Sequence, residues 1–127
     1  MTRKTVATEN APAAVGPYSQ AVISGDLVFC SGQVGLDPST GDLVTGSVED
    51  ETRRCLQSLG AVLEAAGCTF ADVVKVTAFL TDMNDFAAFN SAYGSFFEED
   101  PPARATIGVA GLPKGARVEV ECIARVP

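Results

Sequence analysis

An arginine and two glutamates lie close together in the largely apolar segment 101–121, PPARATIGVAGLPKGARVEVE. Arg104 opens one strand-like run two residues before Thr106, and Glu119 and Glu121 lie in the next run. A guanidinium offers a two-pronged fork to a carboxylate, Thr106 adds a hydroxyl, and a glutamate can orient water. These residue types therefore indicate binding of a small organic acid. The alternative, an Arg–Glu ion pair on an exposed strand worth about 0–1 kcal/mol, stays open on the pattern alone.

How these side chains face one another depends on the pairing of the two runs. If the runs form a hairpin that turns near 112–114, Thr106 lies opposite Glu121, and Arg104 lies further along the same strand. Alternate residues of a strand share a face, so Arg104 and Thr106 are then expected on the same face as Glu119 and Glu121. A slip of one residue reverses this expectation.

The chain contains no histidine, so acid–base chemistry near neutral pH falls to a carboxylate, a hydroxyl, a thiol or bound water. A Ser-His-Asp triad is impossible, and no Walker A, GxSxG or GxGxxG sequence occurs. The cysteines form no CxxC pair and, without histidine, no usual zinc ligand set. We expect no metal and no cofactor, and we expect buried, reduced thiols at Cys30, Cys55, Cys68 and Cys122.

Three further places are candidates for shaping a ligand site. The first is Tyr18, which the turn 16–20 presents. The second is the pair Ser31 and Gly32, which end a strand where a backbone N–H can approach a ligand. The third is Asn90, which lies on an apolar helical stripe. Each has a structural alternative. Tyr18 can cap the edge of the core, Gly32 can mark a β-bulge, and Asn90 can bond a neighbouring loop.

Length and charge limit the classes of function. A chain of 127 residues forms a single domain, 1–127, and its net charge of -7 argues against a nucleic-acid surface. No run of about 18 uncharged apolar residues is present, and the N-terminal residues lack the apolar stretch of a signal peptide. We therefore expect a cytoplasmic protein with no membrane or nucleic-acid partner.

Hydrophobic periodicity and turn signals predict eight elements in the order β-ββ-α-β-α-ββ, an α+β fold. Both helices are amphipathic and are expected to cover one face of a mixed sheet. Self-association is one way to cover the other face. The predicted strands are 4–8, 22–23, 27–30, 73–80, 104–109 and 117–126, and the predicted helices are 47–66 and 82–97.

Seven collinear segments together resemble the Rid family, the reactive intermediate deaminases, also called the YjgF family, and the RidA subfamily in particular. Each segment is weak alone, but together they cover essentially the whole chain. They are ATENAP (7–12), GPYSQ (16–20), SGQ (31–33), DVVK (72–75), DMNDF (82–86), PAR (102–104) and LPKG (112–115), the last followed by VEVE (118–121).

The resemblance implies a chorismate-mutase-like α+β fold, with a mixed six-stranded sheet covered by two helices on one face. It also implies a homotrimer with a ligand cleft between each pair of subunits. The implied reaction is hydrolysis of 2-aminoacrylate and 2-imino acids, released by pyridoxal-phosphate enzymes, to 2-keto acids and ammonia. The C=N carbon of a 2-imino acid is already electrophilic, so its hydrolysis needs positioning and water rather than a strong nucleophile, metal or cofactor.

By the same resemblance, Arg104 matches the carboxylate-binding arginine and Glu119 matches the glutamate near the attacking water. Other cleft positions are matched by Tyr18, Ser31, Gly32 and Asn90. The chain departs from many RidA proteins at Thr106, where they carry cysteine, and in a shorter segment before Pro101. The departures bear on substrate range more than on reaction type.

Two other functions remain as alternatives. The first is a non-catalytic small-carboxylate-binding or chaperone-like trimer. The second is ribonuclease activity, which has been attached to relatives. The charge of -7 and the lack of histidine weigh against the second.

Overall fold

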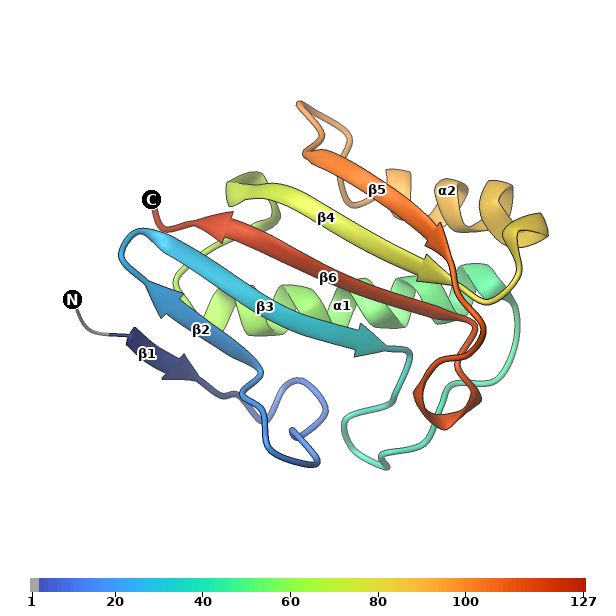
Figure 1. The fold of residues 1–127 in the computed structure, drawn as a ribbon, viewed down its shortest axis with the longest axis horizontal. Helices are drawn as coiled ribbons and strands as arrows, with labels where there is room; N and C mark the ends of the chain where they lie inside the picture. The colour runs from blue at the N-terminus through green and yellow to red at the C-terminus, as the bar shows by residue number, and fades with distance from the viewer. Residues whose placement is uncertain (1–2) are drawn as a thin grey trace.

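The computed structural model describes residues 3–127 as a six-stranded sheet with helices packed on one side (Figure 1). The strand order is β1-β2-β3-β6-β4-β5, and every neighbouring pair is antiparallel except β4 and β5. The mixed sheet and the order of elements confirm the predicted fold class. The strands are β1 Arg3–Val6, β2 Ala21–Ser24, β3 Leu27–Val34, β4 Val73–Leu80, β5 Ala103–Gly108 and β6 Val118–Arg125.

The long helix α1, Val48–Ala65, begins and ends where the local sequence predicts. The Ser47 side chain accepts a hydrogen bond from the Asp50 N–H at 3.1 Å, and Gly67 follows the helix with a φ of 84°, which glycine adopts without strain. Its apolar stripe is buried against the sheet. Within residues 3–127, no helix combines the length and the hydropathy that a membrane crossing needs.

The second predicted helix, 82–97, is shorter than expected. The Asp82 side chain caps a 3-10 turn, Met83–Asp85, by accepting from the Asn84 N–H at 2.9 Å. The α-helix α2 then runs only over Phe86–Gly94. Its aromatic residues pack toward the sheet, so the helix covers the end of the sheet where β4 and β5 lie (Figure 1).

The prediction that the last two strands form a hairpin is wrong. β5 pairs in parallel with β4, and β6 pairs with β3 and β4, so β4 separates β5 from β6. The reason lies in α2, which connects β4 to β5. A helical crossover returns the chain parallel to the strand it left. The segment after β5 then passes through a 3-10 turn, Pro113–Gly115, before β6 begins.

The same pairing overturns the expected facing of the charged residues. Val76 of β4 pairs with both Arg104 and Cys122, whereas Phe79 pairs with both Ile107 and Glu119. Residues paired across neighbouring strands share a face of the sheet, and successive residues along one strand point to opposite faces. Arg104 and Thr106 therefore lie on the helix-covered face of the sheet, and Glu119 and Glu121 lie on the other face.

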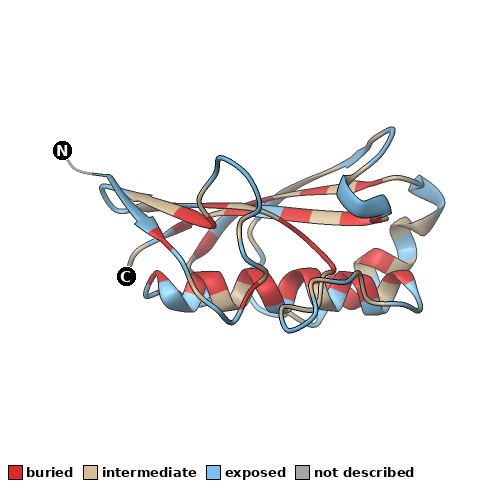
Figure 2. Ribbon diagram, turned by 90° about the horizontal axis from the view of Figure 1, so that it is seen from below, coloured by how far each residue is buried: buried red, intermediate tan, exposed pale blue. Residues whose placement is uncertain are grey.

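The face of the sheet that carries Glu119 is not covered by any helix of the described chain (Figure 2). Apolar side chains are partly exposed there, with Phe29 at 41% and Ile107 at 44% exposure. Both share this face with Glu119, because Ile107 lies in its row and Phe29 pairs with Ile123 of β6. A mixed apolar and acidic surface is thus left open beside the predicted water-binding glutamate.

Glu51 of α1 is a buried carboxylate that joins the helix to the start of β6. Its side chain is 1% exposed and accepts from the Arg117 N–H at 2.6 Å, the Arg117 Nε–H at 2.9 Å and the Val118 N–H at 3.1 Å. Gly35 makes room for it, because a Cβ there would meet the Glu51 Cγ at 2.8 Å. The hydrogen bonds from Arg117 and Val118 to Glu51 attach the start of β6, the strand that carries Glu119, to the helix layer.

Replacing Glu51 by leucine is expected to lower the free energy of unfolding by about 3–5 kcal/mol. The reason is that two backbone N–H groups and the Arg117 side chain lose their carboxylate acceptor. Glu51→Gln keeps one acceptor and is expected to lose less. Urea denaturation measures both. Glu64→Leu, at an exposed position of the same helix, serves as the matched control. Equal stability of the Glu51→Leu and Glu64→Leu proteins would contradict this account.

Candidate functional site: two clusters on one chain

The predicted site residues fall into two clusters. The first, called the Arg cluster, consists of Arg104 and Thr106 from β5 and Asn90 from α2, on the helix side of the sheet. The second, called the Glu cluster, lies where β3 and β6 meet the turn 16–20. It consists of Tyr18, Ser31, Gly32 and Glu119.

Arg104 is half-buried, and its guanidinium lies over the aromatic rings of α2. The Cζ atom is 4.7 Å from the ring centroid of Tyr93, 5.5 Å from that of Phe89 and 5.7 Å from that of Phe86. Asn90 lies on this same helical face, four residues after Phe86. Within residues 3–127, Arg104 makes no ion pair. Its charge is therefore stabilised by ring faces, and its N–H donors are not used by a carboxylate of its own chain.

Two hydroxyls around Arg104 are buried without a hydrogen-bond partner in the described part of the chain. They are the Thr106 Oγ1 and the Tyr93 hydroxyl. Burial raises the pKa of the Tyr93 hydroxyl, although the Arg104 guanidinium acts in the opposite direction. Buried polar groups are nearly always paired, so two orphans beside a cation mark a place where further polar contacts are expected.

Tyr93 lies within the predicted amphipathic helix 82–97, but its contact with Arg104 was not predicted from the sequence. The available signal was the spacing of Phe86, Phe89 and Tyr93 at i, i+3 and i+7, which predicts that their rings pack against side chains of a facing strand. Aromatic residues at this spacing also occur in ordinary cores, and the cation above them becomes visible only once β5 is placed beside α2.

The Glu cluster is built around an irregularity in β3. The register between β3 and β6 shifts between Cys30 and Gln33, which places a β-bulge at Ser31 and Gly32. Ser31 fixes the neighbouring turn, because its N–H donates to the Gln20 carbonyl at 2.9 Å and its hydroxyl donates to the Ser19 carbonyl at 2.6 Å. The bulge proposed as the structural alternative for Gly32 is thus present, and it ties the turn bearing Tyr18 to β3.

Gly32 leaves space for the Glu119 carboxylate. A Cβ at Gly32 would overlap the Glu119 carboxylate, so any other residue there would displace it. Glu119 is half-buried and has no ion-pair partner among residues 3–127. Burial raises the pKa of its carboxyl, and the nearby Glu121 raises it further. The pKa of this carboxyl thus lies above that of an exposed glutamate, which favours proton exchange with water closer to neutral pH.

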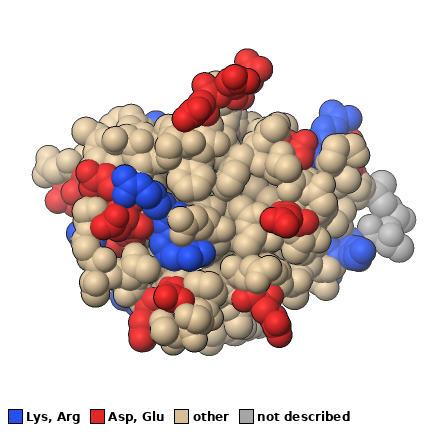
Figure 3. Space-filling view, turned by 180° about the vertical axis from the view of Figure 1, so that it is seen from behind, with Lys and Arg blue, Asp and Glu red and all other residues tan. Residues whose placement is uncertain are grey.

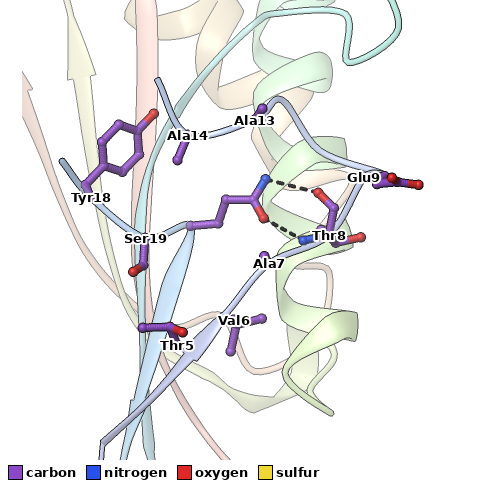
Figure 4. A pocket seen from close by; sticks show the side chains of 10 residues that line it. Thr5, Val6, Ala7, Thr8, Glu9, Ala13, Ala14, Tyr18 and Ser19 are labelled. Atoms are coloured by element: carbon purple, nitrogen blue, oxygen red, sulfur yellow. Dashed lines mark hydrogen bonds between the residues drawn. The ribbon is translucent and has the colours of Figure 1, made fainter. Parts of the chain in front are cut away.

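An open hollow of about 620 Å³ adjoins this cluster, lined by Tyr18, Ser31, Phe29 and neighbouring residues. Tyr18 is 51% exposed, so its ring is available to a ligand or to another chain. A second hollow of about 430 Å³ shares Tyr18 with the first and is bordered by the N-terminal segment (Figure 4). The Gln20 side chain holds that segment by bonding the Thr8 N–H at 2.7 Å and the Thr8 carbonyl at 3.2 Å.

The two clusters do not meet within one chain. Arg104 and Glu119 lie on opposite faces, and two strand spacings, about 10 Å, separate β5 from β6. A small organic acid cannot contact both groups across the sheet.

In the described ranges, no three Cys, Asp or Glu side chains are grouped as metal ligands. On the side opposite to that of Figure 1, basic and acidic side chains are interspersed, with no continuous basic track (Figure 3).

Comparisons with known proteins agree with this architecture. Residues 8–126 match the family model Ribonuc_L-PSP, described as "Endoribonuclease L-PSP". The chain is 54% identical to the mouse protein named 2-iminobutanoate/2-iminopropanoate deaminase, over 96% of this chain and 90% of that protein. The crystal structure of RidA from a Psychrobacter species has a TM-score of 0.93 at 45% identity, covering 97% of this chain and 99% of that one. The structure of E. coli TdcF with bound serine has a TM-score of 0.92 at 42% identity, covering 96% and 98% of the two chains.

Proposed function

Because the chain belongs to the Ribonuc_L-PSP (YjgF/Rid) family, we propose that it hydrolyses 2-imino acids and 2-aminoacrylate-type enamines to 2-keto acids and ammonia. Two features of the molecule support the proposal. Arg104 presents a guanidinium that pairs with no carboxylate among residues 3–127, and Glu119 is a half-buried carboxyl with a raised pKa. The relatives named as deaminases and the serine bound to TdcF fit a small carboxylate-bearing ligand.

In the proposed reaction, Arg104 holds the substrate carboxylate through a two-pronged hydrogen bond, and this fixes the imine carbon in place. Glu119 accepts a proton from a water molecule as the water oxygen bonds to that carbon. The C=N bond becomes a single bond, and its nitrogen takes up a proton. The resulting carbinolamine expels ammonia as its C=O bond forms, and the protons that Glu119 accepts return to the nitrogen. Water supplies the oxygen of the 2-keto acid, so atoms balance without a cofactor.

The site is proposed to form between copies of the chain, in a homotrimer. The separation of the Arg cluster from the Glu cluster supports this, since neither is complete alone. Their positions support it too. Arg104 lies on the edge strand β5, and Glu119 lies on the sheet face that no helix of residues 3–127 covers, the same face that carries the exposed Phe29 and Ile107. A cyclic arrangement would bring the β5 edge of one copy to the open face of the next.

Tyr18, Ser31, Gly32 and Asn90 are proposed as the remaining walls of this cleft, and Thr106 as a hydroxyl beside Arg104. The orphaned Thr106 Oγ1 is the observation that favours a polar role for Thr106. We place the activity in the cytoplasm, where the source imines form and where thiols stay reduced. The four buried cysteines are all unpaired, which suits such a compartment.

The reaction is tested by generating 2-aminoacrylate from serine with a dehydratase and following the decay of enamine and imine absorbance. Addition of the protein is expected to accelerate the decay and to release the keto acid and ammonia in equal amounts. Binding of a 2-keto acid in calorimetry with no acceleration of decay would favour the non-catalytic alternative. The family description also names endoribonuclease activity, and an RNA-cleavage assay on the same preparation tests it directly.

A further inference from the structure

We propose that Tyr93 is a positioning residue for Arg104. Its ring, together with those of Phe86 and Phe89, forms an aromatic floor that orders the guanidinium without pairing it to a carboxylate of residues 3–127. The proposal rests on the proposed function, since it concerns the same carboxylate subsite. Tyr93, Phe86 and Phe89 are not among the site residues that the resemblance implies.

The geometry makes Tyr93 the main contact of the floor. Its centroid lies 4.7 Å from the Arg104 Cζ, closer than the other two rings. The three residues follow one another at three- and four-residue spacing, so they present a single face of α2 to β5. Arg104 points onto that face because it shares the helix side of the sheet with Val76. Attraction between a cation and a ring face strengthens as water is excluded, and Tyr93 is buried.

The floor is itself held rigidly. The Tyr93 ring packs against Phe89, with centroids 5.4 Å apart, and against Phe97, with centroids 4.8 Å apart. Phe97 in turn contacts Phe70 edge to face at 5.3 Å. A platform fixed from several sides cannot follow a moving guanidinium, so it restricts the arginine to one position.

An aromatic floor also differs from an acidic partner in how many N–H donors of the Arg104 guanidinium it leaves available to a ligand. A carboxylate beside Arg104 would take up the N–H donors that a ligand needs, whereas a ring face contacts the plane of the guanidinium. Arginine has many rotamers, and ordering such a side chain at the moment of binding weakens affinity by roughly tenfold. The floor removes this loss by ordering Arg104 in advance.

Nuclear magnetic resonance of the Arg104 Nε–H group tests the positioning without any ligand or turnover. The wild-type signal, identified by its loss in Arg104→Lys, is expected to be shifted by the ring currents and to show little fast motion. Tyr93→Leu is expected to remove the shift and mobilise the group, and Tyr93→Phe to retain both properties. An equally ordered Arg104 in Tyr93→Leu would overturn the proposal. If Tyr93→Leu does not fold, Phe86→Leu at the half-buried edge of the floor replaces it.

A double-mutant cycle then tests whether Tyr93 acts through Arg104. Tyr93→Leu is expected to weaken binding of 2-oxobutanoate about tenfold in the wild-type background. In the Arg104→Ala background it is expected to have no further effect. Phe96→Leu removes a ring that packs on Phe70 but contacts no arginine, and it is expected to leave the affinity unchanged. Equal losses in both backgrounds would show that Tyr93 has only a packing role. Failure of the deaminase assay would leave the resonance result standing, so the two proposals can fail separately.

Discussion

Arg104→Ala is expected to reduce kcat/KM for 2-imino acids by on the order of 10²-fold or more, because a charged two-pronged contact to the substrate carboxylate is lost. Arg104→Lys keeps the charge but not the fork, and it is expected to fall between Arg104→Ala and wild type. The measurement is the rate of imine decay at several substrate concentrations.

The matched control for Arg104→Ala is Arg53→Ala. Arg53 is an exposed arginine of α1 that pairs with Asp50 at 3.0 Å, and its removal is expected to leave kcat/KM unchanged. Full activity of Arg104→Ala would contradict carboxylate binding by this residue. A substrate analogue with an amide in place of the carboxylate provides a second check, since Arg104→Ala is expected to change its turnover much less.

Glu119→Gln is expected to lower kcat by roughly 10²–10⁴-fold, the usual contribution of a positioned acid–base group. Glutamine matches the shape of the side chain above Gly32 but cannot take a proton from water. Glu121→Gln is the matched control on the same strand, at an exposed position, and is expected to retain most activity at neutral pH. Equal activity of Glu119→Gln and wild type would contradict the assigned role.

The pH dependence follows from the raised pKa of Glu119. The carboxylate must be ionised to accept a proton, so kcat/KM is expected to fall as the pH drops through a pKa above the ordinary glutamate value. Because Glu121 contributes to the rise, Glu121→Gln is expected to move this acid limb to lower pH. Ionised Glu119 favours activity but disfavours the folded state, so its effects on activity and on stability have opposite signs. A folded-state pKa that is raised makes the ionised form unfavourable in the fold, so Glu119→Gln is expected to be at least as stable as wild type at neutral pH.

Local sequence signals were sufficient for the type and order of the elements, but not for all of their bounds or for their pairing. The predicted helix 47–66 matches α1 to within about a residue at each end, because the cap at Ser47, the stop at Gly67 and the apolar stripe act within a few residues. The partner of β5 depends on the packing of α2 over the sheet, which involves the whole chain. A short polar turn between two strand-like runs resembles a hairpin even where a third strand separates them.

The same distinction applies to the candidate site. Residue types and spacing singled out Arg104 and Glu119 as candidates for a carboxylate site, and the resemblance added the individual roles of these two residues and of the cleft positions. Spacing failed to predict that Arg104 and Glu119 occupy opposite faces, because their facing depends on the number of strands between them. It also failed to identify Tyr93, whose contact with the guanidinium arises only from tertiary packing.

Arg104 of one copy and Glu119 of another are proposed to act on one substrate, and co-expression of two inactive variants tests this claim. Differently tagged Arg104→Ala and Glu119→Gln chains are expected to form mixed trimers. Random mixing in a closed three-fold ring restores about a quarter of all sites, so about a quarter of wild-type activity is expected. Activity no higher than that of the separately expressed variants, in trimers shown by their tags to be mixed, would contradict the claim.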